Sequence, residues 1–158
     1  MRVGIGYDTH PLVPGRRLVL GGVEISFDRG LEGWSDADVL SHAIIDALLG
    51  AAALGDIGSH FPPGQPEFKD ISSLELLTRV SHTLSREGWQ VVNVDATVIT
   101  EEPKLKDHID KMREQLSRTL GVSLSQVSVK ASTANKLGYI GRGEGIAAQA
   151  VVLIEGSS

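Results

Sequence analysis

The fold is decided by the stretch from Tyr7 to His42, which reads YDTHPLVPGRRLVLGGVEISFDRGLEGWSDADVLSH. Residues 2 to 8 overlap the start of this stretch. They alternate between apolar side chains at 3, 5 and 7 and small or acidic ones at 4, 6 and 8. A strand places residues i and i+2 on the same face. We therefore expect Asp8 and His10 to project together from the face that carries the two glycines.

His42 lies in a helical pattern, with Asp38 and Asp46 four residues away on either side. If this helix packs on the glycine face of the strand, one carboxylate oxygen and two imidazole nitrogens converge. Three protein ligands with an open fourth position is the arrangement of a catalytic zinc. The residues alone leave a second interpretation open, in which the D-x-H strand end is simply polar.

Length and composition exclude several classes of protein. The chain has 158 residues, no cysteine and a net charge of -5. We expect a single domain over residues 1–158, no nucleic-acid partner and no disulfide or thiolate ligand. The longest apolar stretch, 43–54, contains Asp46 and is too short to span a membrane. A cytoplasmic protein is expected.

Hydrophobic periodicity predicts the first half of the chain. It indicates a strand over 2–9 closed by Pro11 and Pro14, and a hairpin over 17–26 around Gly21 and Gly22. A loop over 31–37 then leads to a helix over 38–54, with Ser35 or Asp36 as its N-cap. Because most sides of this helix are apolar, we expect it to be buried.

In the second half, Ser72 and Glu75 form a capping-box pattern that starts a helix over 72–87. Strands are predicted over 90–100, with Val92 on the core face, over 127–133, and over 146–154, which is apolar enough to be covered on both faces. A helix over 105–120 and a glycine-rich loop over 136–145 complete the pattern. The fold class is α/β (α+β): a two-layer sandwich of a mixed sheet with helices on one face. A second subunit is expected to cover the other face.

Two further segments carry polar or charged groups. The loop 138–145, GYIGRGEG, suits an anion site, although a tight hairpin with a charged tip fits equally well. Residues 100–106 lie where a strand meets a helix, which suits a polar ligand or a solvated helix start.

Four motifs, in order along the chain, match one known family. They are G-x-D-x-H at residues 6–10, S-D-x-D-V at 35–39 leading to His42, DALLGAAALGDIG at 46–58, and GRGEGI at 141–146. Over its whole length the sequence resembles the 2-C-methyl-D-erythritol 2,4-cyclodiphosphate synthases of the non-mevalonate isoprenoid pathway.

This resemblance implies a homotrimer whose sheets surround a threefold axis, with active sites between neighbouring subunits. It implies a lyase that converts 4-diphosphocytidyl-2-C-methyl-D-erythritol 2-phosphate to the 2,4-cyclodiphosphate and releases CMP. Zn²⁺ would be held by Asp8, His10 and His42, and Mg²⁺ or Mn²⁺ would accompany the substrate diphosphate. An isoprenoid diphosphate could meet Arg142 and Glu144 on the axis.

The resemblance also assigns roles to individual residues. Trp34 and Thr133 occupy catalytic positions. The positions that would contact substrate are Asp8, His10, Trp34, Ser35, Asp56, Ile57, Gly58, Phe61, Thr100, Pro103, Lys104, Leu105, Lys106, Ala131, Ser132, Thr133, Asn135, Tyr139 and Arg142.

The sequence departs from the family pattern in three places. Trp34 replaces the usual histidine, Asn135 replaces a glutamate that holds the second metal, and residues 63–65 lack the usual acids. These changes leave a competing interpretation, a non-catalytic trimer that binds isoprenoid diphosphates. A zinc hydrolase is a further alternative, with Asp46 as the general base; we interpret Asp46 instead as a residue that supports the metal ligands.

Overall fold

The computed structural model describes residues 1–158 and is built on a five-stranded sheet of order β4-β1-β7-β5-β6. Its strands are β1 (Arg2–Pro14), β4 (Arg29–Leu31), β5 (Trp89–Ile99), β6 (Val127–Ser132) and β7 (Gly145–Gly156). Only β5 and β6 pair in parallel. The predicted hairpin forms a separate two-stranded sheet from β2 (Leu18–Leu20) and β3 (Val23–Ile25). The mixed sheet of the predicted fold class is confirmed.

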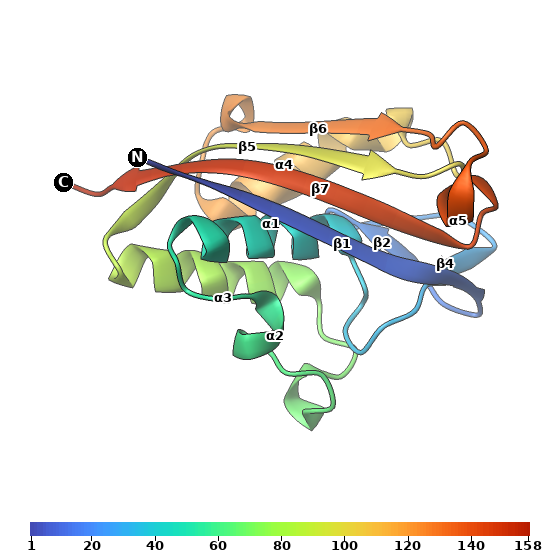
Figure 1. Cartoon of the computed structure of the whole chain (residues 1–158), viewed down its shortest axis with the longest axis horizontal. Coiled ribbons are helices and arrows are strands. Elements are labelled where there is room, and N and C mark those ends of the chain that lie inside the picture. The colour runs from blue at the N-terminus through green and yellow to red at the C-terminus, as the bar shows by residue number, and fades with distance from the viewer.

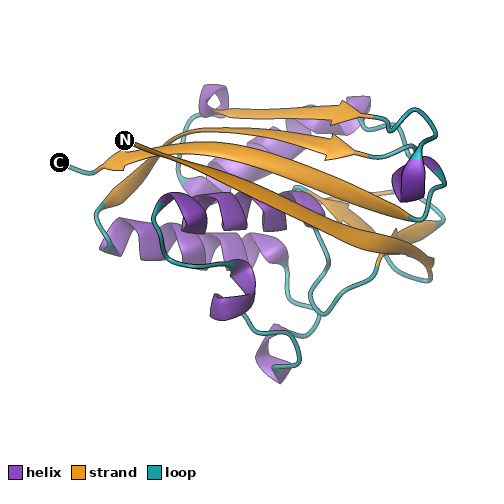
Figure 2. Cartoon of the chain, in the orientation of Figure 1, coloured by secondary structure: helices purple, strands orange, loops and turns teal.

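The helices α1 (Val39–Ala51), α3 (Ser73–Arg86) and α4 (Ile109–Leu120) lie together on one face of the sheet, as Figures 1 and 2 show. Two short helices, α2 (Ile57–His60) and α5 (Gly138–Gly141), and 3₁₀ turns at Pro66–Phe68, Lys106–His108 and Leu124–Gln126 lie in the connections. None of the helices has the length and apolar character needed to cross a membrane. The position of the three long helices on one face of the sheet confirms the predicted two-layer arrangement.

Glycines in β1 let α1 approach the sheet at backbone distance. A Cβ atom on Gly6 would lie 1.8 Å from the carbonyl oxygen of Ala43, and one on Gly4 would lie 1.9 Å from that of Ala47. Only hydrogen fits at either position. This close contact brings the middle of β1 and the first turns of α1, where His42 lies, to the same place.

The opposite face of the sheet is apolar and exposed in the single chain. Val3, Ile5 and Tyr7 of β1 are 69%, 73% and 52% exposed, and Val151 of β7 is 46% exposed. No element of the chain lies over this side, so the prediction that β7 is covered on both faces depends on a second subunit. An apolar sheet face of this kind is typical of a protein interface.

Several predicted boundaries were wrong in the first half of the chain. β1 does not stop near residue 9: it continues through Pro11 to Pro14, because Leu12–Pro14 pair with β4. The predicted loop 31–37 missed β4, which is only three residues long. The N-cap of α1 is neither Ser35 nor Asp36 but Asp38, whose carboxylate accepts hydrogen bonds from the N–H groups of Ser41, Gly21 and Gly22. α1 ends at Ala51 rather than at residue 54.

The second half shows corrections of the same kind. Ser72 is the N-cap of α3 but makes no side-chain capping bond, so the predicted capping box with Glu75 is wrong. A bulge between Val91 and Asn93 takes Val92 out of the ladder, and Val91, rather than the predicted Val92, packs against the core. The predicted helix 105–120 opens as a 3₁₀ turn and becomes α-helical at Ile109, and the glycine-rich loop contains α5.

Candidate active site

Asp8, His10 and His42 converge where β1 meets α1. The Oδ2 atom of Asp8 lies 3.0 Å from Nε2 of His10 and 3.0 Å from Nδ1 of His42. One ligand atom from each residue falls within 4.8 Å of the other two. The residues that the strand and helix patterns predicted to meet are thus brought together.

The other nitrogen of each imidazole ring is held by a neighbouring group. Nδ1 of His10 lies 2.8 Å from the carbonyl oxygen of Glu32, which can only accept a hydrogen bond. Nε2 of His42 lies 2.8 Å from Oγ of Ser73, whose own hydroxyl donates to the carboxylate of Asp36. Both contacts place the ring hydrogen on the nitrogen that faces away from Asp8, and they leave Nε2 of His10 and Nδ1 of His42 free as ligands.

This donor set fits a metal ion. Two atoms that each lie about 2.0–2.1 Å from zinc at a tetrahedral angle are separated by about 3.4 Å. The two separations of 3.0 Å from the Asp8 oxygen need only a small expansion to reach that value, and all three ligand atoms lie within 4.8 Å of one another. A carboxylate and two neutral imidazoles with outward hydrogen bonds also match the chemistry of a three-ligand metal site.

The same contacts shift the pKa values of Asp8 and His10. Burial by itself raises the pKa of Asp8, but hydrogen bonds and charge attraction from the two histidines outweigh it and lower that pKa to about 2. Burial likewise lowers the pKa of His10, and its hydrogen bond and attraction to Asp8 outweigh this effect and raise it above 6.5. Asp8 is therefore ionised at neutral pH and ready to bind a cation.

A cavity of about 240 Å³ surrounds the three residues. Of the predicted substrate positions, Trp34, Ser35, Ile57, Gly58 and Phe61 line it. The indole N–H of Trp34 donates a 2.8 Å hydrogen bond to the carbonyl of Gln65. This bond links Trp34 to the loop that departs from the family pattern, and it occupies the only polar group of the side chain.

Asp56 and Asp46 hold the short helix α2 beside this cavity. The carboxylate of Asp56 caps α2 by accepting from the N–H and hydroxyl of Ser59, and Asp56 itself does not line the cavity. Asp46 accepts a 2.7 Å hydrogen bond from the N–H of Ile57. Burial raises the pKa of Asp46, with Asp56 and Asp8 adding to the effect. Asp46 thus positions the loop at residues 56–58; its hydrogen bond goes to this loop and not to one of the three predicted metal ligands.

A second cavity, of about 380 Å³, brings together another group of the predicted substrate-contacting positions. It is formed where β5 and β6 end, in front of the 3₁₀ turn that precedes α4. Its lining includes the predicted residues Thr100, Pro103, Lys104, Leu105, Lys106, Ala131, Ser132 and Thr133. None of these residues lines the cavity around Asp8, His10 and His42.

The remaining predicted residues lie near the glycine-rich segment. Arg142 lines a third cavity, of about 460 Å³, and forms an ion pair of 3.0 Å with Glu144. The hydroxyl of Tyr139 lies 2.9 Å from that of Tyr7 and 2.8 Å from that of Thr9, which ties α5 to β1. Asn135 is exposed, and its N–H donates to the hydroxyl of Thr133. The structure thus separates these residues from the metal ligands.

Sequence reasoning missed the groups that orient the two histidines. Ser73 and Asp36 are polar residues in patterns that predicted only helix starts, and the group supplied by Glu32 is a backbone carbonyl. A carbonyl gives no signal in a sequence, because every residue has one. Ser73 could have been noticed only by knowing that α3 packs beside α1.

Comparison with known proteins agrees with this geometry. Residues 1–155 match the model of the YgbB family. A 2-C-methyl-D-erythritol 2,4-cyclodiphosphate synthase of Dehalococcoides mccartyi is 58% identical over 98% of this chain and 99% of its own length. The synthase of Moorella thermoacetica is 60% identical over 98% of this chain and 94% of its own.

Solved structures give the same result. The Plasmodium falciparum IspF in complex with CDP superposes with a TM-score of 0.87 and 32% identity, over 99% of this chain and 97% of its own. The bifunctional IspDF of Campylobacter jejuni superposes with a TM-score of 0.95 and 40% identity; the match covers 98% of this chain and 42% of that one. The chain, with its Asp8, His10 and His42 cluster at the β1–α1 contact, therefore belongs to the YgbB family, the family of the 2-C-methyl-D-erythritol 2,4-cyclodiphosphate synthases.

Proposed function

We propose that this protein converts 4-diphosphocytidyl-2-C-methyl-D-erythritol 2-phosphate to 2-C-methyl-D-erythritol 2,4-cyclodiphosphate and CMP. An oxygen of the 2-phosphate forms a bond to the β-phosphorus of the diphosphate. The bond from that phosphorus to the bridging oxygen breaks, and CMP leaves with the electron pair. The convergence of Asp8, His10 and His42 in a chain 58% identical to a named synthase is the observation that carries the proposal.

The metal cavity is the proposed site of ring closure. Zn²⁺ held by Asp8, His10 and His42 would neutralise phosphate charge, and Mg²⁺ or Mn²⁺ would do the same for the diphosphate. The nucleophile is already an anion, so the reaction needs no strong general base. Positioning two repelling phosphates is the main difficulty, and such positioning can contribute up to about 7–11 kcal/mol in the best intramolecular reactions.

The second cavity is the proposed cytidine and diphosphate site. Lys104 and Lys106 line it and supply positive charge where the diphosphate would lie. The hydroxyl of Thr133 is exposed beside them and would donate to a phosphate oxygen. Asn135 would offer the second metal a neutral oxygen, which binds more weakly than a carboxylate. Trp34, fixed by Gln65, would form a wall of the metal cavity rather than carry a proton.

The two cavities would be completed by association into a homotrimer. The apolar face formed by Val3, Ile5, Tyr7 and Val151 supports this assembly, because it lies open on the side of the sheet away from the helices. In the trimer, the metal cavity of one subunit would face the nucleotide cavity of its neighbour. The proposal includes a cytoplasmic location and an isoprenoid diphosphate bound near Arg142 on the axis.

The test is CMP release from the authentic substrate by the purified protein, with bound zinc measured on the same sample. We expect release that requires a divalent cation and about one zinc per chain. The variant His42→Ala should lose both zinc and CMP release. The variant His82→Ala is the matched control, because His82 is exposed on α3 and should behave like the wild type. Full turnover by His42→Ala would overturn the metal assignment.

The assembly is tested by light scattering after size-exclusion chromatography. The wild type should elute at three times the mass of the chain, 16.8 kDa. Ile5→Glu would place a charge at the centre of the exposed apolar face and should yield monomers. Glu24→Ala, an exposed change on β3, is the control. A monomeric wild-type protein would refute the trimer.

A further inference from the structure

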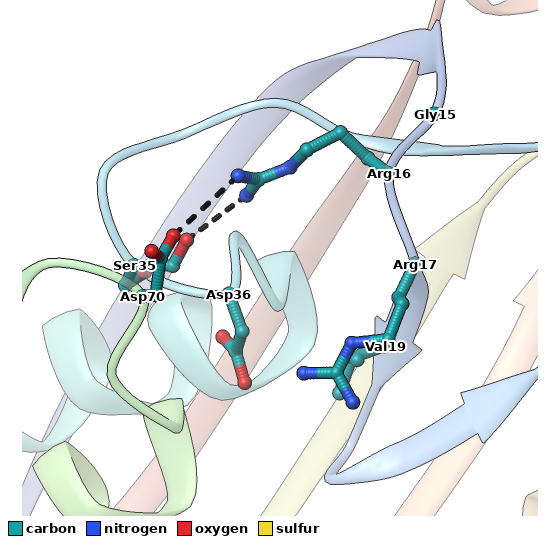
Figure 3. A pocket seen from close by; sticks show the side chains of 7 residues that line it. All are labelled: Gly15, Arg16, Arg17, Val19, Ser35, Asp36 and Asp70. Atoms are coloured by element: carbon teal, nitrogen blue, oxygen red, sulfur yellow. Dashed lines mark hydrogen bonds and ion pairs between the residues drawn. The ribbon is translucent and has the colours of Figure 1, made fainter.

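A polar cavity of about 230 Å³ lies next to the metal cavity. Arg16, Arg17, Asp36 and Asp70 supply its charged groups, and Ser35 lines both this cavity and the one around the histidines (Figure 3). The segment from Leu31 to Ser35 therefore separates the two spaces. The conformation of this segment determines what the metal ligands contact.

The guanidinium of Arg16 holds that segment by its backbone. Its Nε atom donates to the carbonyl of Leu31 at 3.0 Å, and its Nη2 atom donates to the carbonyls of Gly33 at 3.3 Å and Ser35 at 3.0 Å. Figure 3 shows the guanidinium pointing toward Ser35 and Asp70. The ion pair with Asp70 is long, at 3.8 Å, and Asp70 is 69% exposed, so it contributes little.

The carbonyls of the segment alternate in direction. Those of residues 31, 33 and 35 point to Arg16, whereas that of Glu32 points to Nδ1 of His10. The carbonyl of Trp34 accepts from the N–H of Asp70. The backbone bends at residues 33–35, so these hydrogen bonds, and not a regular strand, hold the carbonyl directions. By holding the carbonyls of Leu31, Gly33 and Ser35, Arg16 therefore also holds the Glu32 carbonyl between them in its direction toward His10.

The segment also contacts the histidines directly. Oγ of Ser35 lies 3.2 Å from Nε2 of His42. A Cβ atom on Gly33 would lie 3.0 Å from Cε1 of His10, so the backbone touches the ring. A shift of the segment by a few tenths of an ångström would therefore change the orientation of His10 and the contact of His42 with Ser35.

We propose that Arg16 is a positioning residue for the metal site: by binding the carbonyls of Leu31, Gly33 and Ser35, it aims the Glu32 carbonyl at His10 and the Ser35 hydroxyl at His42. Arg16 does not itself line the metal cavity, and its side-chain hydrogen bonds go to backbone carbonyls rather than to the metal ligands. A guanidinium suits this role because its planar set of donors reaches several acceptors at once. This inference rests on the metal site of the proposed function.

The test uses Co²⁺ as a spectroscopic probe with metal-free protein. Affinity is measured by competition with a chelator, and the coordination geometry is followed by the visible absorption of bound Co²⁺. For Arg16→Met we expect about tenfold weaker binding and an altered spectrum, the size of effect usual for groups that orient a ligand. Arg17→Met is the matched control: Arg17 lines the same cavity, and its ion pair with Glu24 is exposed. It should bind Co²⁺ as the wild type does.

Circular dichroism establishes that each variant is folded before metal is added. Arg16→Lys is the second variant. The lysine ammonium can reach some of the carbonyls, so the Co²⁺ affinity of this variant should fall between those of the wild type and Arg16→Met. Arg16→Lys also replaces Arg16→Met if Arg16→Met does not fold. Wild-type affinity and spectrum in both Arg16 variants, or an equal loss in Arg17→Met, would overturn the role of Arg16. A wild-type protein that binds no Co²⁺ would instead overturn the proposed metal site, and with it this inference.

Discussion

The hydroxyl of Ser73 lies 2.8 Å from Nε2 of His42, at the ring nitrogen that does not face Asp8. Ser73 is the first residue of α3 and is fully buried, so the helix that packs beside α1 also contributes to the metal site. The Ser73 hydroxyl donates a hydrogen bond to the carboxylate of Asp36. This carboxylate also accepts a hydrogen bond from the backbone N–H of Ser73. The start of α3 and the orientation of His42 therefore depend on the same carboxylate.

Replacing Ser73 with alanine tests this connection. The variant leaves Nε2–H of His42 with only the longer contact to Ser35, at 3.2 Å. We expect Zn²⁺ affinity to fall by about 10–100-fold, as is usual when a partner of a ligating histidine is lost. Competition with a chelator measures the effect. Ser72→Ala is the control, because the exposed Ser72 makes no side-chain capping bond. Equal affinities of the two variants would rule out a role for the Ser73 hydroxyl.

Gly6→Ala tests the contact between β1 and α1. The added methyl group would lie 1.8 Å from the carbonyl oxygen of Ala43, so the helix must move away from the strand. We expect a loss of about 3 kcal/mol in the free energy of unfolding, at the upper end for overpacking. The movement should also separate His42 from Asp8 and weaken metal binding. Urea denaturation at one protein concentration measures the first effect.

The control for Gly6 is Gly50→Ala in α1. The nearest atom to its new methyl group would be the Ile5 carbonyl oxygen, at 4.0 Å. Alanine is preferred to glycine within helices by about 0.5–1 kcal/mol, so this variant should be as stable as the wild type or more stable. If Gly6→Ala unfolded at the same urea concentration as Gly50→Ala, the tight packing of β1 on α1 would be refuted.

The pKa shifts of Asp8 and His10 predict how the stability of the metal-free protein changes with pH. The pKa of Asp8 falls from 3.8 to about 2, so its contribution is complete above 3.8 and is lost as the pH falls towards 2. A shift of this size corresponds to roughly 2 kcal/mol. The pKa of His10 is raised above 6.5, so its contribution is complete below 6.5 and is lost as the pH rises through the raised value.

The difference in unfolding free energy between the wild type and Asp8→Asn isolates this effect. It should be largest between about pH 4 and 6.5 and smaller on either side. Metal binding should have the opposite dependence near neutrality, because His10 must be deprotonated to bind. Zn²⁺ affinity should therefore fall as the pH drops through the pKa of His10. A free-energy difference that stays constant from pH 4 to 9 would contradict the shifts.

Regular patterns in the sequence were enough to predict most of the fold. The alternation of residues 2 to 8 gave the two faces of β1, and the spacing of apolar residues gave α1, α3 and α4. The errors fall where pairing with distant residues decides the structure. Pro11 continues β1 because Gly145 lies opposite it in β7, a partner that local propensity cannot reveal.

The same limit applies to the site. Asp8, His10 and His42 were predictable because their spacing on a strand and a helix has chemical meaning. Asp38 lies four residues before His42 in the sequence, and only the structure shows that its carboxylate joins the Gly21–Gly22 turn to α1. Arg16, Glu32 and Ser73 act through bonds to backbone groups or to residues far along the chain. Only the three-dimensional arrangement shows such bonds.

The cavity around the histidines and the cavity around Thr133 have no lining residue in common. In genetic terms, a mutation in one half of the site should be complemented by a chain that carries a mutation only in the other half. A chain carrying His42→Ala and a chain carrying Thr133→Ala should each be inactive as the sole copy, yet unfolding and reassembling them together should restore CMP release. In the proposed trimer, a mixed assembly would bring the intact histidine of one chain opposite the intact threonine of another. The working unit of this protein would then be the boundary between two chains rather than either chain.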